Sequence, residues 1–211
     1  MGKIALKLKT VLWYLKRPRL HLQLVRTIVS KLLSWTETPN TRQEAERWCQ
    51  RQAITTSEAI AKITGLAMPE SVQERFRDVF AAAETVSRQC PVKMGGPGDL
   101  NILYWIAEHF KVKNVIETGV AYGWSSLVIL LSIAKRCDSL LVSTDMPYPN
   151  LNNDEYVGCV VPAELKSHWH IIPLADRDAL PQALKQFHQI DMYSERQSSP
   201  HYNFCKFLSG P

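Results

Sequence analysis

The stretch that most constrains this chain runs from Asn114 to Leu131, NVIETGVAYGWSSLVILL. Val115 and Ile116 are β-branched and favour a short buried strand. Two glycines follow in the next turn, and the apolar run after Trp124 favours a helix. A strand–glycine turn–helix unit brings backbone N–H groups and a helix N-terminus beside the strand end. We therefore predict that this turn binds a nucleotide-like ligand.

The predicted strand ends in an acid, Glu117, which precedes the turn glycines Gly119 and Gly123. A carboxylate at this point suits ribose hydroxyls and repels a pyrophosphate. A nucleoside that carries positive charge is therefore favoured over NAD. The turn GVAYG also lacks the G-x-G-x-x-G pattern of nicotinamide-binding turns. Capping of the following helix is the alternative role for Glu117 and for Asp145, the acid that ends the next strand.

Further buried strands and helices alternate after this unit. Strands are predicted at SLLVST before Asp145, at WHIIPL before Asp176 and at residues 190–193. Alternating β and α units with right-handed crossovers build an open parallel sheet. We therefore predict an α/β fold, a Rossmann-like, doubly wound and mostly parallel sheet. The sheet is expected to be incomplete, with about four strands, and to follow an N-terminal helical region.

Residues 1–35 are predicted to form a basic amphipathic helical arm, with eight Lys/Arg and no acid. Since the whole chain carries +5, the remainder carries −3, and a mildly acidic body gives no support to nucleic-acid binding. Apolar residues recur at helical spacing on both sides of Pro18, which predicts two helices. We favour packing on the body or on another subunit, as in a homodimer. Peripheral contact with an anionic membrane and a mitochondrial-type presequence are the alternatives.

Residues 36–92 are predicted to be helical cover ahead of the sheet, and residues 93–211 to be the Rossmann-like domain. Helices are expected at 44–61 and 70–87, and Ser57 is a candidate cap for a helix that ends near Gly65. The glycine loop KMGGPGD, at 93–99, is predicted to be a connector or lid over the ligand turn. A cradle for an anion is the alternative.

The ordered motifs VIETGVAYGWSS and VSTDMPYP resemble those of class I S-adenosylmethionine-dependent methyltransferases, in the O-methyltransferase-like group. The resemblance runs from about Met94 to Tyr193, with Ala121 at the family's middle glycine position. Asp145 matches the family's ribose-binding acid, and Asp176 matches the acid near the adenine edge. The resemblance implies S-adenosylmethionine as cofactor. Its implied binding residues are Glu117, Thr118, Gly119, Ala121, Tyr122, Gly123, Ser125, Ser126, Asp145, Met146 and Asp176.

The resemblance ends after the fourth strand, where the family has an acid-rich turn and three more strands. Here the sequence continues Ser-Glu-Arg-Gln at 194–197, which predicts a C-terminally truncated member. The implied function is methyl transfer to an unidentified small molecule at oxygen. The alternative is a truncated, non-catalytic binding or interaction protein. No catalytic base is assigned, and no metal site is expected because Arg196 and Gln197 stand where acids would be needed.

Five scattered cysteines without CxxC spacing indicate reduced thiols. No apolar run reaches the ~18 residues of a membrane span. The N-terminus also lacks a signal-peptide pattern. We therefore expect a cytoplasmic protein, peripheral to the membrane if the arm binds lipid.

Overall fold

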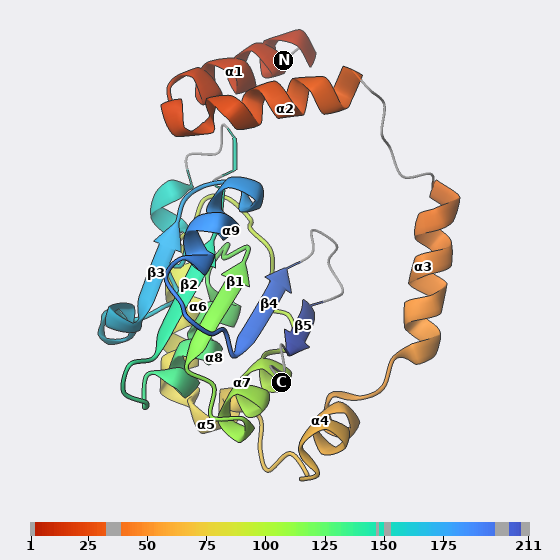
Figure 1. The fold of residues 1–211 in the computed structure, drawn as a ribbon, viewed down its shortest axis with the longest axis vertical. Helices are drawn as coiled ribbons and strands as arrows, with labels where there is room; N and C mark the ends of the chain where they lie inside the picture. Colours follow the sequence, from red (N-terminus) through yellow and green to blue (C-terminus); the bar gives the residue numbers. More distant parts are fainter. Residues whose placement is uncertain (1–2, 33–38, 147, 150–152, 197–202, 208–211) are drawn as a thin grey trace.

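The fold is taken from a computed structural model of the 211-residue chain. The structure describes residues 3–32, 39–146, 148–149, 153–196 and 203–207. Its centre is a twisted sheet with helices on both faces, and a pair of helices lies across one end (Figure 1).

The sheet has five strands in the order β3-β2-β1-β4-β5. Strands β1 to β4 are parallel, and β5 is antiparallel to β4. The predicted α/β fold with an incomplete parallel sheet is confirmed, and the structure adds a fifth strand in a segment that has no sequence period. The strands are β1 Asn114–Thr118, β2 Leu140–Thr144, β3 Trp169–Ile172, β4 Met192–Arg196 and β5 Asn203–Phe207.

Alternate residues of each strand face opposite sides of the sheet, as the two-residue period of a strand requires. Val115, Leu141 and Met192 lie in register and join the larger core, beneath α7 and α8. Ile116 and Val142 join the smaller core, beneath α9. The sheet is therefore doubly wound. The covering helices are α7 Leu100–His109, α8 Trp124–Ile133 and α9 Asp176–Leu184.

The helices ahead of the sheet are divided more finely than the sequence suggested. The helix expected at 44–61 is two helices, because Thr55 and Glu58 form a reciprocal capping box that starts a new one. Thr55, rather than Ser57, is the cap. The helix expected at 70–87 is interrupted at Phe76, where φ is −123°. The helices are α3 Pro39–Gln52, α4 Thr56–Thr64, α5 Val72–Arg75 and α6 Arg77–Arg88.

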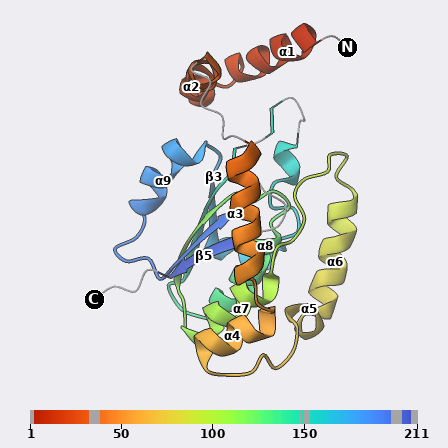
Figure 2. The same cartoon turned by 90° about the vertical axis from the view of Figure 1, so that its right-hand side faces the viewer.

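These helices differ in their distance from the sheet. Figure 1 shows α3 standing apart from the strands, whereas Figure 2 shows α6 along one side of the body. Helix α4 packs against α7. Two short 3-10 helices, η2 Asp154–Tyr156 and η3 Ala163–His168, lie between β2 and β3.

The basic arm folds as α1 Lys3–Leu15, η1 Pro18–Leu20 and α2 His21–Leu32. Its buried residues are Trp13, Tyr14 and Leu20, which pack with Leu24, Met146 and Leu174. Met146 follows β2 and Leu174 follows β3, so the arm lies on the carboxyl ends of the sheet.

An ion pair adds to this contact, since Arg17 Nη2 lies 3.1 Å from Asp154 Oδ2. The guanidinium also lies over the ring of Trp13, 4.2 Å from its centroid. None of the described helices is both long enough and apolar enough to cross a lipid bilayer.

Candidate functional site

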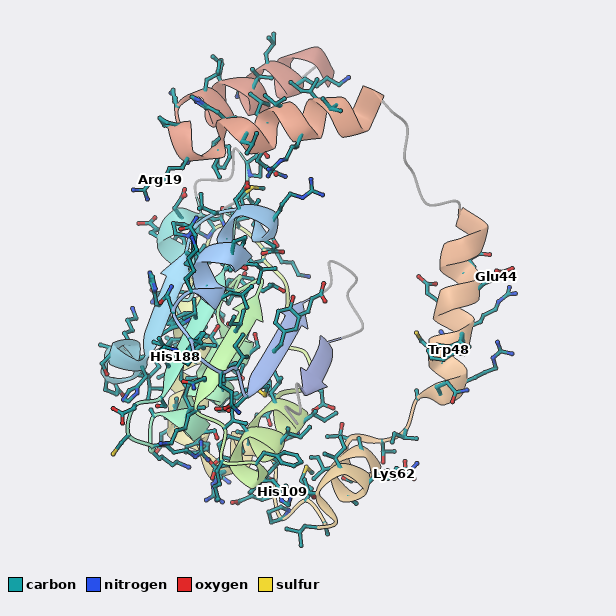
Figure 3. All side chains as sticks on the ribbon, viewed as in Figure 1. Arg19, Glu44, Trp48, Lys62, His109 and His188 are labelled. Atoms are coloured by element: carbon teal, nitrogen blue, oxygen red, sulfur yellow. The ribbon has the colours of Figure 1, made fainter. Side chains whose placement is uncertain are left out.

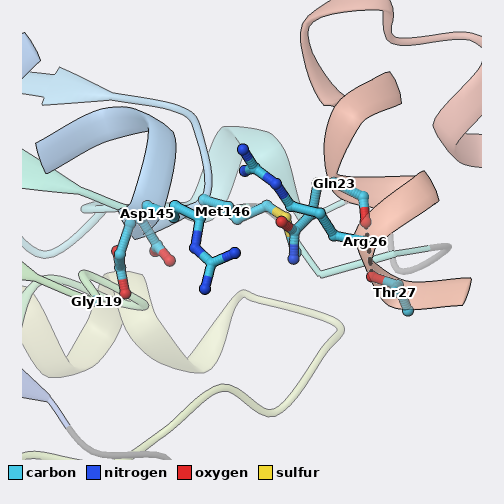
Figure 4. Close-up of a pocket in the computed structure, with 9 residues that line it drawn as sticks. Gln23, Arg26, Thr27, Gly119, Asp145 and Met146 are labelled. Atoms are coloured by element: carbon cyan, nitrogen blue, oxygen red, sulfur yellow. Dashed lines mark hydrogen bonds between the residues drawn. The ribbon is translucent and has the colours of Figure 1, made fainter. Parts of the chain in front are cut away.

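A cavity of about 550 Å³ lies where β1, β2 and β3 end, between the sheet and α2 (Figure 4). In an open parallel sheet, ligands bind outside the carboxyl ends of the strands, so this is the expected edge. Four of the residues predicted to bind the cofactor line this single cavity. The lining residues are Gln23, Arg26, Thr27, Gly119, Asp145, Met146, Ala175, Asp176 and Arg177.

The glycine turn after β1 has three residues with positive φ: Gly119 at 79°, Ala121 at 50° and Gly123 at 92°. The N–H of Gly119 donates to the carbonyl oxygen of Thr144 at 2.8 Å. The N–H of Ala121 donates to Oδ2 of Asp145, also at 2.8 Å. These two bonds join the turn to the end of β2, and they fix the position of the predicted ribose-binding carboxylate.

The turn also leaves no room for a side chain at Gly123. A Cβ on this residue would lie 2.9 Å from the Cα of Gly158, which belongs to the segment between β2 and β3. Gly158 is itself enclosed, because a Cβ there would lie 2.3 Å from the ring of Trp169. The N–H of Gly158 donates to the carbonyl of Ala121 at 2.8 Å. Two glycines therefore let the segment after β2 pack directly against the turn.

Asp176, the predicted adenine-side acid, is the first residue of α9. Its Oδ1 accepts a hydrogen bond from the hydroxyl of Thr144, the last residue of β2, at 2.6 Å. A carboxylate in the first turn of a helix is also stabilised by the helix dipole. Asp176, which follows β3 in the sequence, is thus held beside the end of β2.

Glu117 occupies a different place from the other predicted acids. It is 1% exposed, and its Oε2 accepts hydrogen bonds from the hydroxyls of Ser126 at 2.6 Å and Ser143 at 2.7 Å. Ser143 in turn accepts the indole N–H of Trp169 at 2.8 Å. Glu117 shares a strand face with Val115, so its side chain lies under α8 and is not in the cavity lining. Its role towards a ligand stays a prediction.

The other predicted residues are not among those that line the cavity. Thr118 is buried, and Ser125 lies in the first turn of α8. The hydroxyl of Tyr122 accepts the N–H of Met94 at 3.1 Å and donates to the carbonyl of Val92 at 3.1 Å. The start of the glycine loop KMGGPGD therefore lies against the glycine turn, in line with a connector.

The cavity roof comes from α2, which sequence reasoning did not connect with the site. Gln23, Arg26 and Thr27 recur at a spacing of three and one residues, which puts them on one side of the helix. Arg26 Nη1 donates to both carboxylate oxygens of Asp178, in α9, at 2.7 and 2.8 Å. This polar side within an otherwise apolar helix was the only sequence signal. The arm is thus part of the cavity wall.

The lining carries two carboxylates, Asp145 and Asp176, and two guanidinium groups, Arg26 and Arg177. No histidine of the described residues lines it, and Figure 3 places His109 and His188 away from the arm. Across the described ranges, no three His, Cys, Asp or Glu side chains are grouped to hold a metal ion.

Two further titratable residues, Asp191 and Tyr193, lie outside the cavity lining. Asp191 lies at the opposite end of the sheet, where its Oδ2 accepts the N–H groups of Lys113 and Asn114 at 2.9 Å each. Burial raises the pKa of the Tyr193 phenol. The phenol therefore stays protonated at neutral pH.

No family model and no curated protein matches the chain. Solved structures similar to it include an O-methyltransferase from Bacillus cereus in complex with SAH, at 11% identity. That match covers 66% of this chain and 60% of the other, with a TM-score of 0.41. The O-methyltransferase TomG from Streptomyces achromogenes, in complex with SAM, matches at 15% identity, over 68% and 63% of the two chains, with a TM-score of 0.44.

A methyltransferase from Geobacter sulfurreducens matches at 21% identity, over 66% of this chain and 64% of the other, with a TM-score of 0.41. The chain thus spans between 60% and 64% of the length of these three proteins.

Proposed function

We propose that the chain binds S-adenosylmethionine in the cavity beneath the arm and transfers its methyl group to a small molecule, at oxygen. The observation that carries this proposal is the convergence of Gly119, Asp145, Met146 and Asp176, which come from three strand ends, on one cavity. The resemblance in sequence motifs also implies these four residues as cofactor-binding. At about 550 Å³ the cavity is within the roughly 300–1,000 Å³ of ligand pockets.

The hydrogen-bond acceptors of the cavity lining suit the nucleoside part of this cofactor. Carboxylates only accept hydrogen bonds, and the ribose hydroxyls and the adenine amine donate them. Asp145 and Asp176 are the two acceptors in the lining, and both are oriented by bonds to the chain. Gly119 has no side chain, so backbone can approach the ligand closely at the end of β1. The residues present therefore fit S-adenosylmethionine.

When bound, the cofactor would supply an electrophilic methyl group on a positively charged sulfur. The chain's own contribution is then to bind, orient and exclude water. Asp145 and Asp176 hold the nucleoside, and Gln23 and Arg26 of α2 cover it from the solvent side. Removal of the acceptor's proton needs a base, and we assign that role to no described residue.

A second candidate is a binding protein that holds S-adenosylmethionine without transferring its methyl group. The favouring observation is that no histidine of the described residues lines the cavity, and that its two carboxylates, Asp145 and Asp176, are the groups assigned to the nucleoside. Neither is positioned as a spare base. The two candidates share the cavity and differ only in turnover.

Calorimetric titration of the purified chain with S-adenosylhomocysteine tests donor binding. We expect a saturable exothermic interaction, and we expect Asp145→Asn to raise the Kd about tenfold or more, or ~1–3 kcal/mol. Asp138→Asn is the matched control, because Asp138 is exposed in the turn before β2, with a φ of 58° that asparagine tolerates. Absence of heat with the unaltered chain would reject both candidates.

Mass-spectrometric detection of methyl transfer to a panel of small hydroxyl compounds separates the candidates. A methylated product supports the transferase, and binding without product for every acceptor supports the binding protein.

We also propose a cytoplasmic location. The free thiols of Cys49, Cys90, Cys137 and Cys159 support it, because disulfides are rare in that compartment.

A further inference from the structure

The arm has a second face, turned away from the cavity, that is apolar. On α1 the side chains of Leu8, Leu12 and Leu15 are 54–59% exposed, at a spacing of four and three residues. This spacing puts them on one side of the helix. On α2, helical spacing likewise groups the exposed side chains Leu22, Val25 and Val29. We call these six residues the outer face of the arm.

The inner side of the same helices is occupied. Trp13 and Tyr14 of α1 are buried against the body. Gln23 and Arg26 of α2 line the cavity. Packing on the body therefore explains only part of the arm's apolar residues, and the outer face stays in contact with solvent. Large apolar side chains grouped in this way mark an interaction surface.

The charges on the arm indicate the kind of partner. Arg17 and Arg26 pair with acids of the body, at Asp154 and Asp178. The remaining cations with described side chains are exposed and have no ion pair with a described acid: Lys7, Lys9, Lys16 and Arg19. On the α1 helix, the 100° turn per residue places Lys9 and Lys16 on one side of the leucine stripe and Lys7 on the other. The outer face is thus an apolar stripe with a cationic border.

We propose that the outer face of the arm binds an anionic lipid surface. Leucine and valine side chains enter the boundary between headgroups and acyl chains, while lysines pair with headgroup phosphates. A second copy of the chain, joined face to face, would bring the same cations together, and residues 1–35 contain no acid to offset them. Charge complementarity therefore favours lipid over self-association.

The consequence is that α2 contacts both the membrane and the cavity, on adjoining sides of the helix, since Leu22 and Arg26 are only four residues apart. Leu22 and Val25 would meet the membrane, while Gln23 and Arg26 cover the cavity. The cavity would then lie close to the membrane surface. This proposal does not depend on the methyltransferase function, because lipid binding is measured without cofactor.

Vesicle sedimentation of the full chain tests it, with phosphatidylcholine vesicles that contain or lack phosphatidylglycerol. We expect binding only with phosphatidylglycerol, and weaker binding as salt is raised. The double variant Leu12→Ser/Val25→Ser should lose at least about tenfold in affinity. Lys9→Glu/Lys16→Glu should lose about fivefold or more for each lysine. Leu184→Ser and Lys185→Glu are the controls, since both residues are exposed on the body, and neither should change binding.

Three outcomes would overturn the proposal. One is equal binding to neutral vesicles, and another is displacement by soluble glycerophosphate, which would indicate a site for a free anion. The third is a dimer in solution that Leu12→Ser/Val25→Ser converts to monomer. Unchanged circular dichroism and unchanged affinity for S-adenosylhomocysteine in the variants would show that the body and the cavity are intact. Loss of lipid binding with donor binding retained would separate this result from the proposed function.

Discussion

The backbone N–H of Ala121 donates to Oδ2 of Asp145 across 2.8 Å. Ala121 lies in the turn after β1, and Asp145 follows β2, so this bond joins the ends of two adjacent strands. The carboxylate is oriented before any ligand arrives, which lowers the cost of binding. The bond also requires Ala121 to keep its positive φ of 50°.

Substitution at Ala121 tests how much this conformation costs. The left-handed region costs a non-glycine residue roughly 1–2 kcal/mol, and glycine would remove this strain. Glycine also loses more conformational entropy on folding, which offsets much of the strain relief. We expect Ala121→Gly to leave the free energy of unfolding within about 1 kcal/mol of the original. Ala121→Val should lower it by about 2 kcal/mol or more, because β-branching adds to the strain. Urea unfolding measures both, and equal stability of the two variants would contradict this account.

Gly123→Ala should be more damaging than its size suggests. The new methyl group would lie 2.9 Å from the Cα of Gly158, and backbone cannot move aside as a flexible side chain can. We expect a loss of about 2 kcal/mol or more in thermal or urea unfolding. Gly65→Ala is the control, because Gly65 also has a positive φ, of 73°, and a Cβ there meets nothing within 4 Å. Similar losses in both variants would remove the close approach as the cause.

The ion pair of Arg26 with Asp178 should stabilise the arm on the body. Both side chains are about one-third exposed or less, at 30% and 26%, and Nη1 of Arg26 donates to both carboxylate oxygens of Asp178. A double-mutant cycle with Arg26→Gln and Asp178→Asn should give a coupling of ~1 kcal/mol in urea unfolding.

The pair of Glu84 with Arg88, on α6, is the control. Its side chains are 58% and 78% exposed, so solvent screens the charges and the coupling should be only ~0.3 kcal/mol. A coupling for Arg26 and Asp178 no larger than this would mean that the salt bridge does not fix the arm.

Cys159 should react slowly with iodoacetamide at neutral pH. Burial raises the pKa of its thiol, so little of the reactive thiolate is present below that pKa, and the rate should rise as the pH increases through it. Cys137 is exposed and serves as the internal reference. Peptide mass spectrometry after timed alkylation measures both residues in one sample. Reaction of Cys159 as fast as that of Cys137 at neutral pH would contradict the prediction.

The sequence alone determined the four parallel strands of the sheet, though not β5, and three of the acids that end or follow these strands. The local pattern of apolar residues predicts such features, because short apolar runs between turns are typical of buried strands. Asp145 and Asp176 could be assigned to one edge for the same reason, since parallel strands bring their carboxyl ends together. The turn glycines could also be recognised from the sequence, because few residues other than glycine readily adopt a positive φ.

Only the tertiary structure decided where Glu117 points and what covers the cavity. The two-residue alternation of β1 places Glu117 on the face under α8, where the hydroxyls of Ser126 and Ser143 meet it, and this face depends on register with β2. Arg26 reaches Asp178 across 152 residues of sequence. The local pattern of apolar and polar residues cannot predict a contact between residues so far apart in the sequence. The division of the arm into an inner and an outer face follows from that docking, because a helix periodicity predicts an apolar stripe but not what it meets.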